Sequence, residues 1–298
     1  INSLVINLKP DITIILGPTA IGKTELSIKK AIETNAEIIS ADAFQIYKGL
    51  NIGTAKPTID ETKNIPHHNI DIKEPTESFS VSEFLSLTKS HINRCRENKK
   101  PIIICGGTAF YLKAFLYNYP IETFPSQNET IRKKLNNQLI KNGPQALWET
   151  LNNLDSDTAK LIHPNNTQRV IRALEVFYIT EKKPSLSRTK SQKPRQDTKI
   201  IGLTAERTII YDRINRRVND MFKNGFIREV EALLNQGVTQ SDPSFAALGY
   251  KEVALHLKGS LSLAETISII QTKTRQFAKR QMTWFKTFEN INWINKTK

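Results

Sequence analysis

The chain has 298 residues, of which 39% are hydrophobic and 24% are charged, and its 43 Lys and Arg residues exceed its 29 Asp and Glu residues to give a net charge of +14. This composition is ordinary for a globular protein with one large domain or two. No apolar run approaches the roughly 18 residues of a membrane span, and two cysteines imply no disulfide framework, so we exclude membrane proteins and disulfide-stapled scaffolds and expect a cytoplasmic protein.

The positive charge is concentrated in the later part of the chain. Residues 1–125 carry 14 basic and 13 acidic side chains, residues 126–198 carry 13 and 7, and residues 199–298 carry 16 and 9. A solvated basic surface explains such an excess, and so does a binding surface for a polyanion. The charge distribution alone leaves both interpretations open.

The first predicted elements are a buried strand at residues 12–16 and a helix that extends to Ile32. Between them lies the pattern Gly-x-x-x-x-Gly-Lys-Thr, which binds phosphate in a strand–loop–helix context. Glycine lets several N–H groups turn toward one anion, the helix N-terminus adds a positive dipole end, and lysine adds a point charge. The threonine hydroxyl is placed to bind Mg²⁺ on the same phosphates. The predicted diphosphate-binding residues are Gly17, Pro18, Thr19, Ala20, Ile21, Gly22, Lys23 and Thr24, with Thr24 as the metal ligand.

Further alternation of strands and helices predicts an α/β fold, a P-loop NTPase-like parallel sheet flanked by helices on both faces. After a strand at residues 36–40 and a loop at 43–57, we expect a helix at 80–98, a strand at 101–105, and a helix that ends near Tyr117. The ligand crevice of such a sheet lies at the carboxyl ends of its strands. The phosphate-binding loop, Asp42 and the turn Gly106-Gly107-Thr108 all lie at such ends.

The chain changes character after Pro125. Residues 126–198 contain predicted helices and no strand, and we interpret them as a helical insertion domain in a core formed by residues 1–125 and 199–298. A strand at residues 199–203 is expected to rejoin the sheet. The other predicted helices cover residues 130–141, 144–152 and 167–181 in the insertion, and 207–224, 227–235 and 262–286 after it.

The acidic residues near the loop are fewer than a nucleotide enzyme normally has. P-loop kinases and hydrolases carry a second acid at the end of a neighbouring strand to hold Mg²⁺. Here the strand at 101–105 ends in Cys105 and Gly106, and Asp42 is the one acid at a strand end near the loop. We therefore consider proton abstraction by Asp42. A small-molecule or nucleotide kinase remains an alternative, as does an RNA-binding protein that uses nucleotide as a switch.

Several motifs resemble those of the bacterial tRNA dimethylallyltransferases, in the family's order and over most of the chain. They lie at residues 17–24, 40–47 with 51–57, 66–71, 106–114, 168–175, 248–252 and 276–285. The resemblance implies transfer of a dimethylallyl group from dimethylallyl diphosphate to the exocyclic amine of the adenosine 3′-adjacent to the tRNA anticodon. Diphosphate is released.

The resemblance also implies the catalytic residues. The phosphate-binding loop, with Mg²⁺ at Thr24, would hold the diphosphate leaving group. Asp42 matches the family's general base, Thr19 matches a position near the reacting amine, and Arg217 matches an arginine on the diphosphate. Without that match, we would interpret Arg217 as an exposed charge on a helix.

Three positions depart from the family's usual pattern. Ala43 stands where Ser is most frequent, which removes a hydroxyl beside the proposed base. Phe110 and Phe115 replace aliphatic residues after the glycine turn, so we expect a slightly reshaped prenyl pocket.

On the tRNA side, the resemblance implies that the insertion binds the anticodon stem-loop, which agrees with its positive charge. Arg169 and Arg172 are three residues apart on a predicted helix and share a face that can contact phosphates, opposite an apolar face that includes Val170. The expected tRNA-binding residues are Asp42, Ala43, Phe44, Gln45, Thr108, Gln168, Arg169, Val170, Ile171 and Arg172. We expect a monomer whose partners are tRNA and dimethylallyl diphosphate, and no membrane.

Three other groups of residues have less specific interpretations. Basic and aromatic side chains interleave at residues 273–288, which suits RNA, although aromatic residues in such a helix more often pack in the core. His67, His68 and Asp71 lack the spacing of a metal site. Cys95 and Cys105 are expected to be buried apolar residues.

Overall fold

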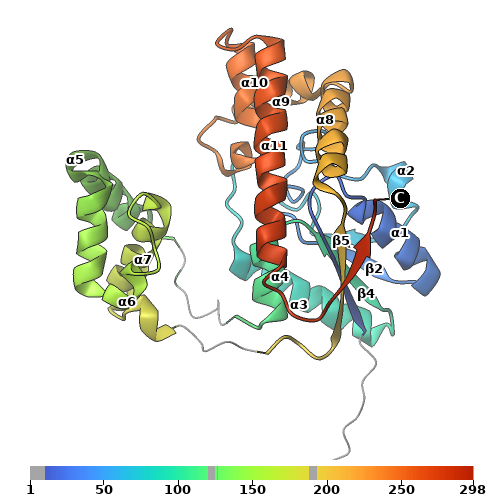
Figure 1. The fold of residues 1–298 in the computed structure, drawn as a ribbon, viewed down its shortest axis with the longest axis horizontal. Helices are drawn as coiled ribbons and strands as arrows, with labels where there is room; N and C mark the ends of the chain where they lie inside the picture. The colour runs from blue at the N-terminus through green and yellow to red at the C-terminus, as the bar shows by residue number, and fades with distance from the viewer. Residues whose placement is uncertain (1–10, 120–124, 126, 188–192, 298) are drawn as a thin grey trace, which may run out of the picture. The chain divides into compact units, whose positions relative to one another are not determined.

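A computed structural model describes residues 11–119, 125, 127–187 and 193–297, and Figure 1 shows its fold. The chain divides into two compact units. The first, which we call the sheet unit, comprises Ile1–Tyr117 and Pro194–Lys298, and the second, the helical unit, comprises Asn118–Lys193. The insertion expected at residues 126–198 overlaps this second unit.

The sheet unit is built on six parallel strands in the order β3-β2-β4-β1-β5-β6. Their bounds are β1 Ile12–Leu16, β2 Glu37–Ser40, β3 His67–His68, β4 Ile102–Gly106, β5 Thr198–Thr204 and β6 Ile291–Asn295. The four predicted strands are confirmed, and β5 rejoins the sheet beside β1. The edge strands β3 and β6 were not predicted, because β3 has only two residues and β6 is an exposed segment without a buried apolar run.

The helices of the sheet unit confirm the predicted ones within a few residues. They are α1 Lys23–Thr34, α2 Ile59–Thr62, α3 Val81–Glu97, α4 Ala109–Leu116, α8 Arg207–Lys223, α9 Phe226–Asn235, α10 Tyr250–Leu257 and α11 Leu263–Phe285, with a short 3-10 helix η3 at Pro243–Ala246. Of these, α2 and α10 were not predicted. Ser80 and Glu83 form a reciprocal capping box that sets the start of α3. The long helix α11 packs beside α8, and α9 packs beside α10 (Figure 1).

The register of the sheet brings the carboxyl ends of the central strands to one edge. Leu16 at the end of β1 pairs with Gly106 of β4 and Gly202 of β5, and Ser40 at the end of β2 pairs with Cys105. Below this edge, alternate strand side chains are buried against α1 and α8 in one hydrophobic core. The core therefore fixes the height at which the loops after β1, β2 and β4 leave the sheet.

The helical unit has its own hydrophobic core. Its elements are α5 Glu129–Leu154, α6 Ser156–Ala159, α7 Thr167–Thr180 and the 3-10 helix η2 Pro184–Ser187. The backbone at Gly143 is non-helical, with φ 79° and ψ 171°, so α5 consists of two helical segments, as predicted. Leucines from both segments pack against Val170 and Leu174 of α7. None of the helices in the described part of the chain is long and apolar enough to cross a membrane.

Candidate functional site

A cavity of about 880 Å³ lies at the carboxyl ends of β1, β2 and β4 in the sheet unit. Its wall includes the loop after β1, Asp42 after β2, the turn after β4, and Arg217 from α8. The residues that line it are Thr19, Ala20, Ile21, Gly22, Lys23, Thr24, Glu25, Ile28, Lys29, Ile32, Glu33, Asp42, Gln45, Thr54, Ala55, Glu61, Lys63, Cys105, Gly106, Gly107, Arg213 and Arg217. The cavity therefore brings together residues 19–24 of the predicted phosphate-binding loop and all three predicted catalytic residues, whereas Gly17 and Pro18 are not among its lining residues.

The loop at residues 17–24 requires its two glycines. A Cβ atom on Gly17 would lie 2.8 Å from the carbonyl oxygen of Leu203, so no side chain fits there. Gly22 has φ 94°, a left-handed conformation that disfavours other residues, and it directly precedes α1. The first N–H groups of α1 have no partner within the helix and carry its positive dipole end. The cavity is thus supplied with N–H donors for an anion.

Lys23 adds positive charge beside these donors. Its Nζ donates a hydrogen bond of 2.8 Å to the carbonyl oxygen of Pro18. The pKa of Lys23 is lowered to about 8, chiefly by burial and also by the positive charge of Arg217, while the nearby Cys105 and Asp42 oppose the shift. An anion bound in the cavity would therefore stabilise the charged form of this ammonium group.

Asp42 is held in position by the turn that it begins. Its Oδ1 accepts hydrogen bonds from the backbone N–H groups of Phe44, at 2.9 Å, and Gln45, at 3.3 Å. No hydrogen bond from any described residue reaches Oδ2. One oxygen of the carboxylate therefore fixes its orientation, and the other can accept a proton or bind a cation.

Arg217 lies in the cavity and not on an exposed helix face. Its Nη1 lies 3.5 Å from Oγ1 of Thr19, and burial lowers the pKa of its guanidinium while the attraction of Asp42 opposes the shift. The interpretation of Arg217 as an exposed helix charge is therefore wrong, whereas its neighbour Arg216 is exposed.

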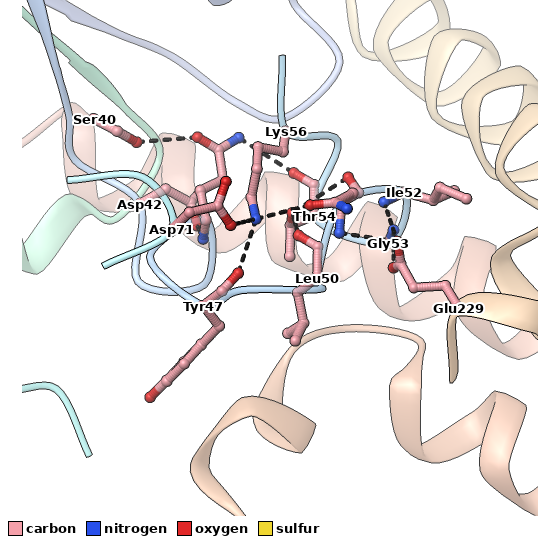
Figure 2. Close-up of polar contacts among 12 residues, drawn as sticks. Ser40, Asp42, Tyr47, Leu50, Ile52, Gly53, Thr54, Lys56, Asp71 and Glu229 are labelled. Atoms are coloured by element: carbon pink, nitrogen blue, oxygen red, sulfur yellow. Dashed lines mark hydrogen bonds and ion pairs between the residues drawn. The ribbon is translucent and has the colours of Figure 1, made fainter. Parts of the chain in front are cut away.

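The loop after Asp42 is shaped by two half-buried side chains (Figure 2). Gln45 accepts a hydrogen bond from Oγ of Ser40 and donates to the carbonyl oxygens of Thr54 and Ala55. Lys56 donates to the carbonyl oxygen of Tyr47 at 2.8 Å and forms an ion pair with Asp71. The amide of Gln45 therefore links Ser40 to Thr54 and Ala55, which line the cavity.

Glu229 of α9 holds the same loop from its other side. Its carboxylate accepts hydrogen bonds from the consecutive N–H groups of Asn51, Ile52 and Gly53 at 2.9, 2.7 and 3.1 Å, and from the hydroxyl of Tyr250 at 2.6 Å. Figure 2 shows the carboxylate facing the backbone of Ile52 and Gly53. Sequence reasoning missed this contact because some 178 residues separate the partners.

The turn after β4 contacts the turn that carries Asp42. Oγ1 of Thr108 accepts a hydrogen bond of 3.0 Å from the N–H of Ala43, which stands at the position where Ser was noted as usual. Phe110 is 43% exposed and Phe115 is buried beneath Arg195, and neither lines the cavity. The expectation that these two phenylalanines reshape the pocket is therefore wrong.

In the helical unit, the five predicted tRNA-binding residues of α7 differ in exposure. Gln168 and Arg169 are exposed, whereas Val170 and Ile171 are buried in the core of the unit. Arg172 is half-buried, where it donates to the buried carboxylate of Glu175 at 2.6 Å and to the carbonyl oxygen of Pro125. Only Gln168 and Arg169 present exposed side chains to a ligand.

Glu37, His68 and Cys95 bring potential metal ligands within 4.8 Å of one another, away from the cavity. The carboxylate of Glu37 already accepts from Lys100 at 2.8 Å and lies 3.5 Å from Arg94. With two cations beside its only carboxylate, the cluster is better described as an ion-pair network than as a metal site. As expected, Cys95 is buried, whereas Cys105 is half-buried and lines the cavity.

At residues 273–288, the aromatic side chains divide between core and surface. Phe285 and Phe288 are buried, whereas Trp284 is half-buried and meets the exposed Phe110 edge-on. Among the basic residues, Lys273, Lys279, Arg280 and Lys286 are exposed and Arg275 is half-buried. The core interpretation therefore holds for Phe285 and Phe288, and an exposed basic face remains on α11.

Comparison with known proteins gives a consistent result. Residues 45–288 match the family described as IPP transferase. A tRNA dimethylallyltransferase of Alkaliphilus oremlandii is 44% identical over 97% of this chain and 92% of the relative. The crystal structure of tRNA delta(2)-isopentenylpyrophosphate transferase from Staphylococcus epidermidis is 42% identical with a TM-score of 0.70, over 97% of this chain and 94% of that one. A structure of a eukaryotic dimethylallyltransferase acting on tRNA is 29% identical with a TM-score of 0.82, over 96% and 74% of the two chains.

Proposed function

The chain belongs to the IPP transferase family, and we propose that it transfers a dimethylallyl group from dimethylallyl diphosphate to N6 of the adenosine 3′-adjacent to the anticodon of tRNA. One observation carries the proposal: a single cavity holds a glycine-rich loop, a half-buried arginine, and a carboxylate of which one oxygen accepts no hydrogen bond from the described residues. The first two groups suit an anionic leaving group, and the third suits an amine that must lose a proton.

The leaving group would lie against the loop at residues 17–24. As the bond between C1 of the prenyl group and the diphosphate oxygen breaks, negative charge develops on the diphosphate. The N-terminal N–H groups of α1, the ammonium of Lys23 and the guanidinium of Arg217 would stabilise that charge. Thr19, whose hydroxyl faces Arg217, would lie between the diphosphate and the reacting amine.

The residues at the loop fit Mg²⁺ as the metal cofactor. Thr24 lines the cavity and its hydroxyl makes no hydrogen bond to any residue of the described chain, so it can act as a ligand beside diphosphate oxygens and water. When bound, the ion would neutralise part of the diphosphate charge. Thr24 would hold it.

Asp42 would act as the general base. N6 of adenosine attacks C1, a C–N bond forms as the C–O bond breaks, and the proton of the amine passes to Oδ2 of Asp42. Because Oδ1 is committed to the N–H groups of Phe44 and Gln45, the carboxylate keeps its orientation throughout. Reaching Asp42 requires the adenosine to leave the stack of the anticodon loop.

We propose that the helical unit binds the anticodon stem-loop. Its exposed Gln168 and Arg169 can contact the RNA backbone, and beside them Arg172 is held by Glu175 of the same helix and by the carbonyl oxygen of Pro125. Near the base, Thr108 and the turn at residues 42–45 would contact the target nucleotide. The buried Val170 and Ile171 are left out of this proposal.

The test is incubation of the protein with unmodified tRNA and labelled dimethylallyl diphosphate, and separately with ATP. Label transfer to tRNA without ATP supports the proposal, whereas phosphoryl transfer from ATP with no prenylation refutes it. Asp42→Asn keeps an acceptor at Oδ1 but cannot take the proton, and we expect kcat to fall by about 10²–10⁴-fold with tRNA affinity within a few fold. Asp212→Asn, an exposed aspartate on α8, is the control.

A further inference from the structure

Gln281 is a buried side chain of α11 that lies between two loops of the cavity. It is 4% exposed. Its Oε1 accepts a hydrogen bond of 2.9 Å from the N–H of Thr19, and its Nε2 donates one of 2.9 Å to the carbonyl oxygen of Gly107. Because one partner is an N–H group and the other a carbonyl, the orientation of the amide is determined by its contacts. One side chain thus connects the loop after β1 with the turn after β4.

The contacts of Gln281 continue to the turn that carries Asp42. Next to Gly107, Thr108 donates its N–H to the carbonyl oxygen of Ala41 at 3.1 Å and accepts from the N–H of Ala43 at 3.0 Å. These two bonds bracket Asp42 on both sides. A path of hydrogen bonds, joined by the peptide bond between Gly107 and Thr108, therefore runs from Thr19 through Gln281 to the residues on either side of Asp42.

The fit around the amide is close. A Cβ atom on Gly107 would lie 2.4 Å from Nε2 of Gln281, whereas the next nearest atoms would be 3.7 and 3.8 Å away. Gly107 therefore has room for a methyl group only if the amide moves. The same amide takes the N–H of Thr19 out of the set available to an anion, so its contact with Thr19 serves to position the loop.

We propose that Gln281 is a positioning residue that fixes the separation between the diphosphate-binding loop and Asp42; this inference rests on the proposed prenyl transfer. The reaction needs the amine, C1 and the leaving oxygen in line, with the reacting atoms about 3–3.5 Å apart, and a misplacement of about 1 Å costs about a hundredfold in rate. Gln281 sets this separation without touching either substrate.

The first experiment compares Gln281→Leu and Gln281→Glu with the wild type. Leu removes both hydrogen bonds at similar size, and Glu keeps the acceptor for Thr19 but loses the donor to Gly107. We expect kcat to fall by about 10- to 100-fold for Leu and by less for Glu, with KM for both substrates within about threefold. Gln276→Leu, an exposed glutamine on the same helix, should retain wild-type kcat. A Gln281→Leu protein with unchanged kcat overturns the proposal, as does a loss confined to KM.

The second experiment changes Gly107, whose backbone contacts the amide of Gln281, and it does not depend on the folding of Gln281→Leu. Gly107→Ala should lower kcat about tenfold or more in the wild type, because the methyl group displaces the amide, but should add little in a Gln281→Ala background, where the space is free. Additive effects of the two changes refute the role. Absence of any prenyl transfer by the wild type would refute the proposed function, and this inference with it, whereas transfer with additive effects refutes the inference alone.

Discussion

The attachment of the loop at residues 51–57 to Glu229 is a test of how the cavity wall is held. Glu229→Gln removes the charge from an acceptor of four hydrogen bonds and points an NH₂ group toward N–H donors. The hydroxyl of the fully buried Tyr250 loses a charge-assisted bond worth about 1.5–3 kcal/mol. The three backbone donors are exposed or half-buried, so water replaces part of each bond and they lose about 0.5–1 kcal/mol each.

These contributions sum to about 3–6 kcal/mol of local stability, which corresponds to at least a hundredfold increase in opening of the loop. Hydrogen exchange of the amides at residues 51–53 measures this directly, and we expect it to accelerate by about that factor. KM for dimethylallyl diphosphate should rise at the same time, because Thr54 and Ala55 of this loop line the cavity.

Three further variants test how the loop is held. Tyr250→Phe removes one of the four bonds and should lose about half of the local free energy that Glu229→Gln loses. Glu231→Gln, which changes an exposed glutamate on the same helix, should leave exchange at residues 51–53 unchanged. In Gly53→Ala the new methyl group would lie 2.4 Å from the ring of Phe226, so the same loop should open without any loss of charge. Unchanged exchange at residues 51–53 in Glu229→Gln would show that the carboxylate does not hold the loop.

Three other outcomes follow from the charges. Because burial lowers the pKa of Lys23 to about 8, its ammonium group is charged below that pH and loses its charge as the pH rises through it. Diphosphate affinity, measured by calorimetry between about pH 6.5 and 9.5, should therefore fall on the alkaline side. An affinity that does not change with pH would contradict this prediction. Glu175→Ala leaves Arg132 and Arg172 without their buried partner and should destabilise the helical unit by about 3–5 kcal/mol in denaturant unfolding, unlike a change at the exposed Glu181. Arg169→Ala should weaken tRNA binding and reduce the slope of log affinity against log salt by about 1, and an unchanged slope removes Arg169 from the interface.

The sequence predicts the parts of this site that depend on local pattern. The spacing of Gly17, Gly22 and Lys23 after an apolar strand is enough to predict the loop, because the turn and the helix start are determined within a few residues. Asp42 follows from the same logic, since the ends of parallel strands meet at one edge. In both cases the structure depends on neighbouring residues that a pattern can describe.

Other parts of the site depend on contacts across the chain, which no local pattern contains. Gln281 reaches Thr19 over 262 residues and Gly107 over 174, and nothing near it in sequence distinguishes it from Gln276, five positions earlier and exposed. In α7, by contrast, the sequence predicted too many ligand-binding residues. The helical periodicity already placed Val170 on the apolar face, yet the family's motif carried it into the tRNA-binding set along with its exposed neighbours. Where periodicity and a motif disagree about a side chain, burial follows periodicity.

The arrangement of charge in the cavity suggests why one carboxylate suffices. In the protein without substrates, Lys23 and Arg217 both attract Asp42, so the carboxylate is partly neutralised by the same cations that serve the phosphate-binding loop. When diphosphate binds at the loop, its negative charge interacts with these two cations, and Asp42 then lies beside an anion. Binding of the donor would thus withdraw both cations from the carboxylate that we propose as the base, whereas a second strand-end acid would compete with Asp42 for the same cations.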